Sequence, residues 1–317
     1  ERLTFDLQAS IAAALNFPGK SSQEKAEKFM LRYFQYAREV GTLTRIFCAV
    51  LEDENLRIPV APFAQENVAK TLMLDGGRLQ FAVSQALNAQ PTLVVELFYV
   101  AQQNGLDIHP RAQLAIARAL PKIARQLPFE GRANQLFLEM LLSPKAPEAT
   151  LQRMNEMGVL GALIPEFGRV TGMMQYDGYH TYTVDEHTLV AVGNLSTIES
   201  GVWEKDIPLA SALAQEVGDR AALFLAMLCH DLAKGSGGGH AEKGEAIVAR
   251  IALRLGLSIA QGELAGWLVR SHLILSETAF KRDLDDPKTI VDFVAVVQSP
   301  ERLRLLLLLT VADIKAV

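Results

Sequence analysis

Apolar residues recur every three to four positions along most of the chain, the spacing of one face of an α-helix. In the first half this pattern predicts helices at residues 4–15, 21–54, 92–104, 111–127, 134–142 and 149–157. In the second half it predicts helices at residues 184–200, 220–233, 241–255, 263–275, 287–297 and from 299 onward. Only residues 57–63 and 77–83 have the pattern of short extended segments. The chain is therefore predicted to be mainly all-α, with a few short strands.

Two features organise this series of helices. The long helix at residues 21–54 carries an apolar stripe that we expect to face the core: Phe29, Tyr33, Tyr36, Val40, Leu43, Phe47, Val50 and Leu51. Pro144 and Pro147 interrupt the pattern and predict a boundary between a first domain, residues 1–145, and a second domain, residues 146–317. Residues 166–182 are rich in Gly, Met and Tyr, and predict an irregular connection.

Composition narrows the class of protein. Half of the 317 residues are hydrophobic and only 7% are aromatic, which favours packed helices and excludes a disordered or disulfide-scaffold protein. A net charge of −5 argues against a nucleic-acid binder. Without a membrane-spanning run or a signal peptide, and with two cysteines, we expect a cytoplasmic protein. The chain begins without Met and stops inside a helical pattern, so we expect a piece of a longer protein.

Five of the six histidines lie between residues 180 and 272. Residues 183–186 match a capping box, which would place His187 in the first turn of a helix. His230 and Asp231 end the apolar helix at residues 221–229, where a buried polar pair needs partners. A divalent metal is one such partner, and imidazole with carboxylate suits Mn, Fe or Zn better than Mg.

Three more features follow in the sequence. Residues 234–240 form a glycine-rich segment, which can turn sharply and bring backbone close to a ligand, with Lys234 placed to meet an anion and His240 at its end. His272 lies in the segment at residues 269–273. Asp313 lies in an apolar helix, where a lone carboxylate needs an explanation. Each feature taken singly has a structural alternative: a surface histidine, a helix end, a flexible loop or a solvent-facing carboxylate. For His180, a core contact and a substrate contact are equally good interpretations.

Taken together, the order His187, His230-Asp231, Asp313 on separate helices resembles the HD phosphohydrolase superfamily. His240 and His272 fall where two-metal members carry a second set of ligands, and the resemblance implies that Asp231 bridges the two metals. A closer resemblance is to the bacterial enzymes that attach UMP to, and remove it from, the nitrogen-signalling protein PII. The motifs that carry it lie at residues 179–189, 230–235, 238–240, 281–287 and 309–314, with similar connecting segments at 21–51 and 153–168. The chain departs from the family in reading Ser271-His272-Leu273 where His-His-Leu is common, and it lacks the transferase motif, a Gly-Ser pair followed by Asp-x-Asp.

This resemblance implies an HD-domain helical bundle at residues 146–317, preceded by the end of the nucleotidyltransferase region and a helical connector. It implies a hydrolase that removes UMP from uridylyl-tyrosine of PII, with one or two divalent ions, Mn²⁺ or Mg²⁺, or else Fe²⁺ or Zn²⁺. Glutamine would act only through ACT domains outside this chain. The implied ligands are His187, His230, Asp231, Asp313, His240 and His272. The implied catalytic residues are Asp231, Lys234 and His240, and the implied substrate contacts are Lys234, His180 and Arg282.

Two alternatives remain open from the sequence. One is an HD hydrolase acting on free nucleotides or cyclic dinucleotides, although the chain has no Gly-Tyr-Pro motif after the histidine cluster to favour the cyclic version. The other is a regulatory helical module that binds a partner protein and holds a structural metal. A structural site would bind metal without hydrolysing any phosphodiester.

Overall fold

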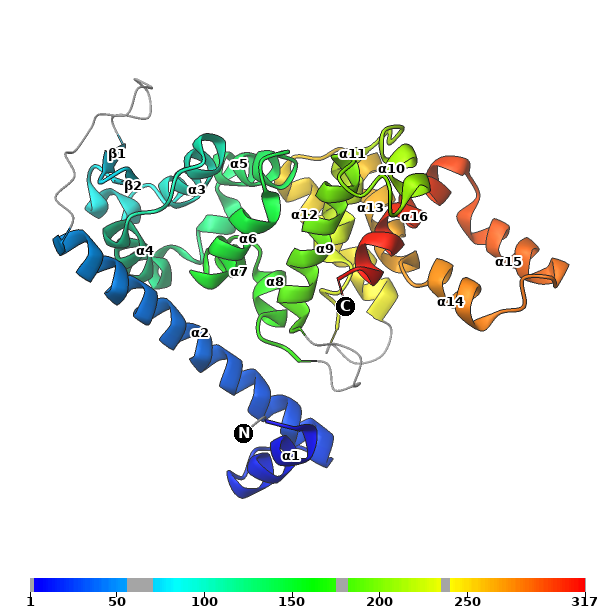
Figure 1. Cartoon of the computed structure of the whole chain (residues 1–317), viewed down its shortest axis with the longest axis horizontal. Helices are drawn as coiled ribbons and strands as arrows, with labels where there is room; N and C mark the ends of the chain where they lie inside the picture. Colours follow the sequence, from blue (N-terminus) through cyan, green and yellow to red (C-terminus); the bar gives the residue numbers. More distant parts are fainter. Residues whose placement is uncertain (1–2, 56–70, 175–181, 235–239, 317) are drawn as a thin grey trace. The chain divides into compact units, whose positions relative to one another are not determined.

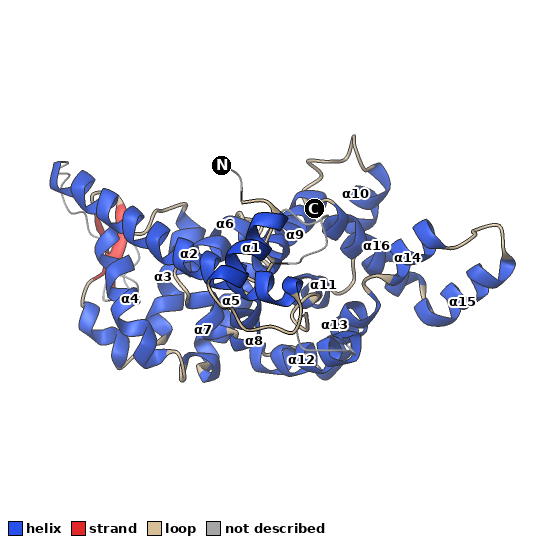
Figure 2. Cartoon of the chain, turned by 90° about the horizontal axis from the view of Figure 1, so that it is seen from below, coloured by secondary structure: helices blue, strands red, loops and turns tan. Residues whose placement is uncertain are grey.

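The computed structural model describes residues 3–55, 71–174, 182–234 and 240–316 (Figure 1). Within these residues the protein is helical apart from one two-stranded sheet, as Figure 2 shows by colour. The prediction of a mainly all-α fold is therefore confirmed. None of the described helices is long and apolar enough to cross a membrane.

Contacts between residues divide the chain into two units, each interrupted in sequence. The first comprises residues 1–133 and 152–187, and the second comprises residues 134–151 and 188–317. The division passes through three helices: α5 (Gly131–Leu141) near its start, α6 (Pro147–Glu156) and α9 (Val184–Glu199). The two units are defined by contacts, whereas the boundary predicted near residue 145 separates domains of the resembled family, so that boundary stays a prediction.

The first unit is built from a long helix, a β-hairpin and several shorter helices. Its further elements are α1 (Phe5–Ala14), α2 (Ser22–Asn55), β1 (Leu72–Asp75), β2 (Arg78–Phe81), η1 (Ser84–Asn88), α3 (Thr92–Asn104), α4 (Pro110–Ile123), η2 (Leu127–Phe129), α7 (Val159–Leu163) and α8 (Pro165–Val170). Strands β1 and β2 pair antiparallel with Leu72 opposite Phe81. Gly76 and Gly77 join them with φ of 57° and 76°, the positive values that a two-residue hairpin turn of type I′ requires. The hairpin agrees with the predicted extended segment at residues 77–83, whereas residues 57–63 lie outside the described part of the chain.

The apolar stripe of α2 is not in the core, contrary to our expectation. Tyr33, Tyr36, Val40, Leu43, Phe47 and Leu51 are between 44% and 65% exposed. The residues that the helix buries are instead Ala26, Met30 and Ile46, and it packs on α1 and α4. A helix with apolar residues on two faces can bury only the face that a neighbour covers, and periodicity alone does not identify that face.

The second unit packs helices around one that is buried over most of its length. Its further elements are α10 (Pro208–Ala214), α11 (Arg220–Cys229), α12 (His240–Leu255), α13 (Ile259–Ser271), α14 (Ile274–Lys281), α15 (Pro287–Val297) and α16 (Pro300–Ile314). Every residue of α11 from Ala222 to Cys229 is buried. Helices α13 and α16 both pack on α11, and α12 pairs with α13. This arrangement directs the end of α11 toward α16.

Two predicted helices end earlier than their apolar pattern suggests. The helix predicted at residues 220–233 ends at Cys229, and the one predicted at 263–275 is divided at His272 into α13 and α14. In both places a histidine occupies the C-cap. The predicted irregular connection at residues 166–182 also contains most of α8, and α10 was not predicted at all.

Candidate metal centre

His230 is placed by the end of the most deeply buried helix. Asp219 caps the start of α11 by accepting a hydrogen bond from the backbone N–H of Ala222 at 3.0 Å. At the other end, His230 Nδ1 lies 2.8 Å from the carbonyl oxygen of Met227. Because a carbonyl can only accept, Nδ1 carries the proton, and the imidazole is fixed with Nε2 facing the neighbouring helices.

Asp313 reaches the same place from α16. Leu305, Leu308 and Leu309 bury one face of this helix, while the Asp313 side chain keeps 18% of its surface exposed. Asn194 of α9 donates a hydrogen bond to the carbonyl oxygen of Ala312 at 3.0 Å and so ties the two helices together beside Asp313. Asp313 Oδ1 lies 3.4 Å from His230 Nε2.

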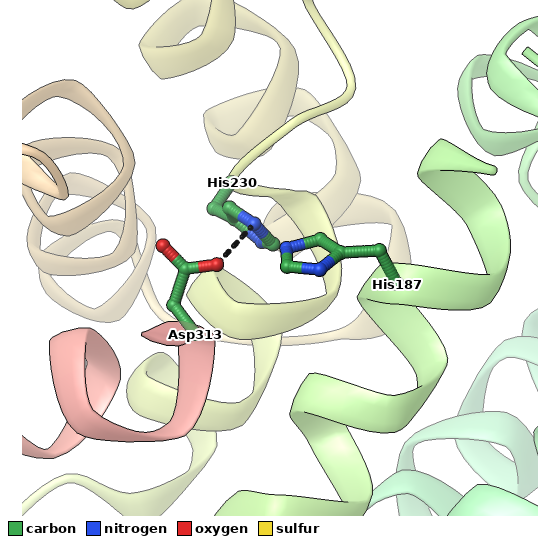
Figure 3. Close-up of side chains that lie close together, drawn as sticks. All are labelled: His187, His230 and Asp313. Atoms are coloured by element: carbon green, nitrogen blue, oxygen red, sulfur yellow. Dashed lines mark ion pairs between the residues drawn. The ribbon is translucent and has the colours of Figure 1, made fainter. Parts of the chain in front are cut away.

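His187, in the first turn of α9, completes a group of three donors. One ligand atom each from His187, His230 and Asp313 lies within 4.8 Å of the others, and Figure 3 shows the three side chains pointing toward one another. The sequence interpretation combined these three residues, and the structure brings them together. His187 and His230 are almost wholly buried, at 2% and 4% exposure.

Asp231 lies next to this group but outside it. Its Oδ2 is 3.4 Å from His230 Nε2 and 2.6 Å from Lys234 Nζ. The carboxylate is 3% exposed. Asp231 therefore links the histidine to the one lysine of the turn that follows α11, residues 230–234.

The charges in the centre favour a cation. Burial by itself lowers the pKa of His230, but the carboxylates of Asp231 and Asp313 outweigh it and hold this pKa well above the ordinary value. Burial by itself raises the pKa of Asp231, but His230 and Lys234 hold it well below the ordinary value. For His272, burial and the nearby charge of His230 lower the pKa.

The residues present fit a divalent metal ion. Two imidazoles and a carboxylate converge from three helices, and Asp231 provides a further carboxylate against the same imidazole nitrogen. The Nδ1 of His230 is held by a backbone carbonyl, the usual support for a histidine that ligates through Nε2. This donor set suits Mn, Fe or Zn, and it does not distinguish among them.

The other predicted site residues lie in different places. The ring of His272 is 5.4 Å from that of His230, centre to centre, and its Nδ1 lies 2.7 Å from the carbonyl oxygen of Val269. Arg282, at the end of α14, forms an ion pair with Asp292 of α15 at 3.3 Å. His180 and the side chain of His240 lie outside the described residues, so their predicted roles stay predictions.

A cavity of about 490 Å³ lies against the centre. Its polar lining comprises His230, Asp231, Lys234, Arg270, Ser271, His272 and Glu277, and its apolar lining comprises Ala233, Leu273, Ile274 and Val296. Arg282 is not among the described residues that line it. The cavity is large enough for a small organic group, and one of its walls is aliphatic.

A second carboxylate near His187 was not assigned a role from the sequence. Asp185 is 3% exposed; one of its oxygens accepts a hydrogen bond from the amide of Asn155 at 2.7 Å, and the other accepts from the backbone N–H of Gly172 at 2.8 Å. These contacts attach the first turn of α9 to α6 and to the end of α8, two residues before His187. Asp185 lies among polar neighbours in the first turn of α9, so no apolar pattern distinguished it in the sequence.

Comparison with known proteins gives three matching family models. Residues 1–48 match the model described as "GlnD PII-uridylyltransferase", residues 73–163 match "Uridylyltransferase GlnD third domain", and residues 208–314 match "HD domain". The last range includes His230, Asp231 and Asp313, and it begins after His187.

The similar curated proteins carry one description. A bifunctional uridylyltransferase/uridylyl-removing enzyme of Azospirillum brasilense is 49% identical over the whole chain. Proteins with the same description from Rhodospirillum rubrum and Novosphingobium aromaticivorans are 48% and 45% identical. The chain spans about a third of the length of these relatives, 34% to 35%.

Proposed function

Because the chain belongs to the family of bifunctional uridylyltransferase/uridylyl-removing enzymes, we propose that its histidine–aspartate centre removes UMP from uridylyl-tyrosine of PII. The observation that carries this proposal is the convergence of ligand atoms from His187, His230 and Asp313 within 4.8 Å. A hydrolytic metal site requires a buried set of ligand atoms beside a cavity that can hold the substrate. An exposed apolar surface, such as the stripe on α2, supplies no such ligands. We place the reaction in the bacterial cytoplasm, with PII and its uridylylated form as partners.

In this reaction the water oxygen forms a bond to phosphorus, and the bond between phosphorus and the tyrosyl oxygen breaks. The proton lost by water ends on the phenol oxygen, so the products are UMP and an unmodified tyrosine. A bound divalent ion would supply Lewis-acid stabilisation of the phosphoryl oxygens and a water nucleophile at neutral pH. We assign His187, His230, Asp231 and Asp313 to hold it, with His240 and His272 as ligands of a second ion.

Lys234 has the position expected of a group that stabilises phosphoryl charge. Its ammonium group lies 2.6 Å from Asp231 Oδ2 and lines the cavity. A phosphodiester in the cavity would meet this cation beside His230 and Asp231, so charge that develops on its oxygens would be stabilised by a group already in place. His180 and Arg282 stay predictions as substrate contacts, and the ion pair with Asp292 gives Arg282 a structural alternative.

The test measures UMP release from uridylylated PII by the 317-residue chain. We expect release with Mn²⁺, none after chelation by EDTA, and none from an Asp313→Asn variant that keeps its helical circular dichroism. A folded chain that binds Mn²⁺ but releases no UMP would contradict the proposal and would favour a structural metal. Release of phosphate from free nucleotides, with uridylylated PII untouched, would favour a hydrolase of small nucleotides.

A further inference from the structure

Ser271 places an unpartnered hydroxyl in the wall of the cavity beside the metal centre. It is the last residue of α13, it is only 7% exposed, and it lines the cavity of about 490 Å³. Within the described residues, its hydroxyl has no hydrogen-bond partner. Buried polar groups in native proteins are nearly always hydrogen-bonded, so an exception that faces a cavity is a group available to a ligand.

Two other hydroxyls of the same unit show what is particular to Ser271. The hydroxyl of Thr310 in α16 donates to the carbonyl oxygen of Leu306, four residues earlier, at 2.8 Å, the usual local solution in a helix. Ser211 of α10 is 4% exposed and its hydroxyl has no partner either, but it does not line this cavity. Ser271 therefore combines a hydroxyl without a local bond and a position in the cavity wall.

Ser271 also lies close to the metal centre. It precedes His272 directly, so the Cα atoms of the two residues are about 3.8 Å apart. The ring of His272 is 5.4 Å from the ring of His230, centre to centre. A phosphoryl group at His230 and Asp231 would thus leave the next part of the same ligand within reach of Ser271.

The connectivity of the substrate decides which part that is. In a uridylyl-tyrosine ester, the phosphorus joins a tyrosine of a folded protein to a free nucleoside. The tyrosine stays attached to its protein, so the nucleoside is the end that can enter a cavity, and the volume lies in the range of pockets that hold small ligands.

The lining of the cavity complements a nucleoside. Among the described residues that line it, Ser271 is the one that carries a hydroxyl. The aliphatic side chains of the lining are Ala233, Leu273, Ile274 and Val296. A ribose presents neutral hydroxyls, which a serine can bind as donor or acceptor, and a pyrimidine base presents flat faces that pack on aliphatic side chains.

We propose that the Ser271 hydroxyl binds a ribose hydroxyl of the uridylyl group, with the base against the aliphatic wall. This inference rests on the proposed function and names the residue that recognises the sugar of its substrate. Ser271 holds the nucleoside, while the metal ligands and Lys234 act on the phosphoryl group.

The test combines a variant that lacks the serine hydroxyl with substrates that lack a ribose hydroxyl. We would compare Ser271→Ala and Ser271→Thr with the unchanged chain on the p-nitrophenyl ester of UMP and on its 2′-deoxy and 3′-deoxy analogues. The matched control is Ser211→Ala, which removes a similarly buried hydroxyl outside the cavity lining. Melting temperatures would be measured for every variant.

We expect Ser271→Ala to lower kcat/KM on the UMP ester by about tenfold, the loss of one hydrogen bond in a buried site. One of the two deoxy analogues should be a poorer substrate of the unchanged chain by a similar factor. On that analogue Ser271→Ala should cause no further loss, because both changes remove the same bond and their effects are then not additive. Ser271→Thr keeps a hydroxyl and should retain most of the activity, and Ser211→Ala should behave as the unchanged chain does.

Two results would overturn the inference. If Ser271→Ala loses as much on both deoxy analogues as on the UMP ester, then the serine contacts neither ribose hydroxyl. If Ser271→Ala leaves kcat/KM on the UMP ester unchanged, or only matches the effect of Ser211→Ala, then its hydroxyl has no part in binding the substrate.

Failure of the proposed function would look different. The unchanged chain would then hydrolyse none of the three esters with Mn²⁺ present. Nucleotide recognition would still be measurable as calorimetric binding of UMP, which Ser271→Ala should weaken by about tenfold and Ser211→Ala should leave unchanged. Equal affinity of all the chains for UMP, or no binding of UMP by the unchanged chain, would overturn the inference independently of turnover.

Discussion

Asp185 offers the sharpest prediction about how the fold supports the metal centre. Its two carboxylate oxygens accept hydrogen bonds from Asn155 and from the backbone of Gly172, all inside the protein, and His187 lies two residues further along α9. Removing the carboxylate would leave two buried donors without their acceptor. It would also release the turn of α9 that presents His187.

The magnitude follows from these two bonds. Each buried donor that loses its acceptor costs about 1–3 kcal/mol, so Asp185→Ala should lower the free energy of unfolding by about 2–6 kcal/mol. Asp185→Asn keeps an acceptor for Gly172, and an amide flip of Asn155 restores the other bond. We therefore expect the asparagine variant to lose only about 1 kcal/mol, the part that depends on the charge.

The assay measures Mn²⁺ affinity by calorimetry together with urea denaturation. Outer contacts that orient a metal ligand typically contribute 10- to 100-fold in affinity, so we expect Asp185→Ala to weaken Mn²⁺ binding by about tenfold. Asp185→Asn should recover most of it. The control is Ile116→Ala, a fully buried truncation in α4 that costs about 2–5 kcal/mol without touching α9.

The comparison between these variants decides the outcome. If Asp185→Ala and Ile116→Ala change Mn²⁺ affinity equally at a similar loss of stability, then Asp185 contributes to stability alone. If Asp185→Asn weakens binding as much as Asp185→Ala, then the charge matters rather than the attachment of α9. Either result would refute the reasoning.

Three further predictions concern the centre and the first unit. Asp231→Ala should abolish Mn²⁺ binding and UMP release while circular dichroism shows unchanged helical content; substantial activity would remove Asp231 from the ligand set. Lys234→Met should lower kcat by about 10²–10³-fold, as loss of a group that stabilises developing charge does, and a change confined to KM would refute that role. Burial raises the pKa of Glu96 above its ordinary value of 4.5, and the charge of Arg132 offsets this only in part. The stability that the protonated Glu96 side chain contributes is therefore complete below about pH 4.5 and is lost as pH rises through the raised pKa. Glu96→Gln should therefore raise the melting temperature by about 1–2 °C at pH 7 and leave it unchanged near pH 4; an equal shift at both pH values would show that ionisation is not the cause.

Several features of this protein follow from the sequence alone. The helical spacing of apolar residues is local, so α3 and α15 begin and end where the pattern predicts, and the order of His187, His230-Asp231 and Asp313 pointed to the HD domain. The helices could be predicted because a helix depends on residues three and four positions apart in the sequence. The motif could be recognised because its residues keep their order along the chain.

Only the tertiary structure decided which residues meet and which faces are covered. His187, His230 and Asp313 come from α9, the end of α11 and α16, and their convergence depends on how these helices pack around a buried one. The same packing ends two apolar helices at His230 and His272, and gives Asp185 a role that no local pattern encodes. The apolar stripe of α2 is the opposite case: its spacing predicted a face in the core, but most of its side chains are exposed within the described residues. Periodicity states that a face is apolar, but burial depends on whether distant parts of the chain can reach it, which is a property of the assembled fold.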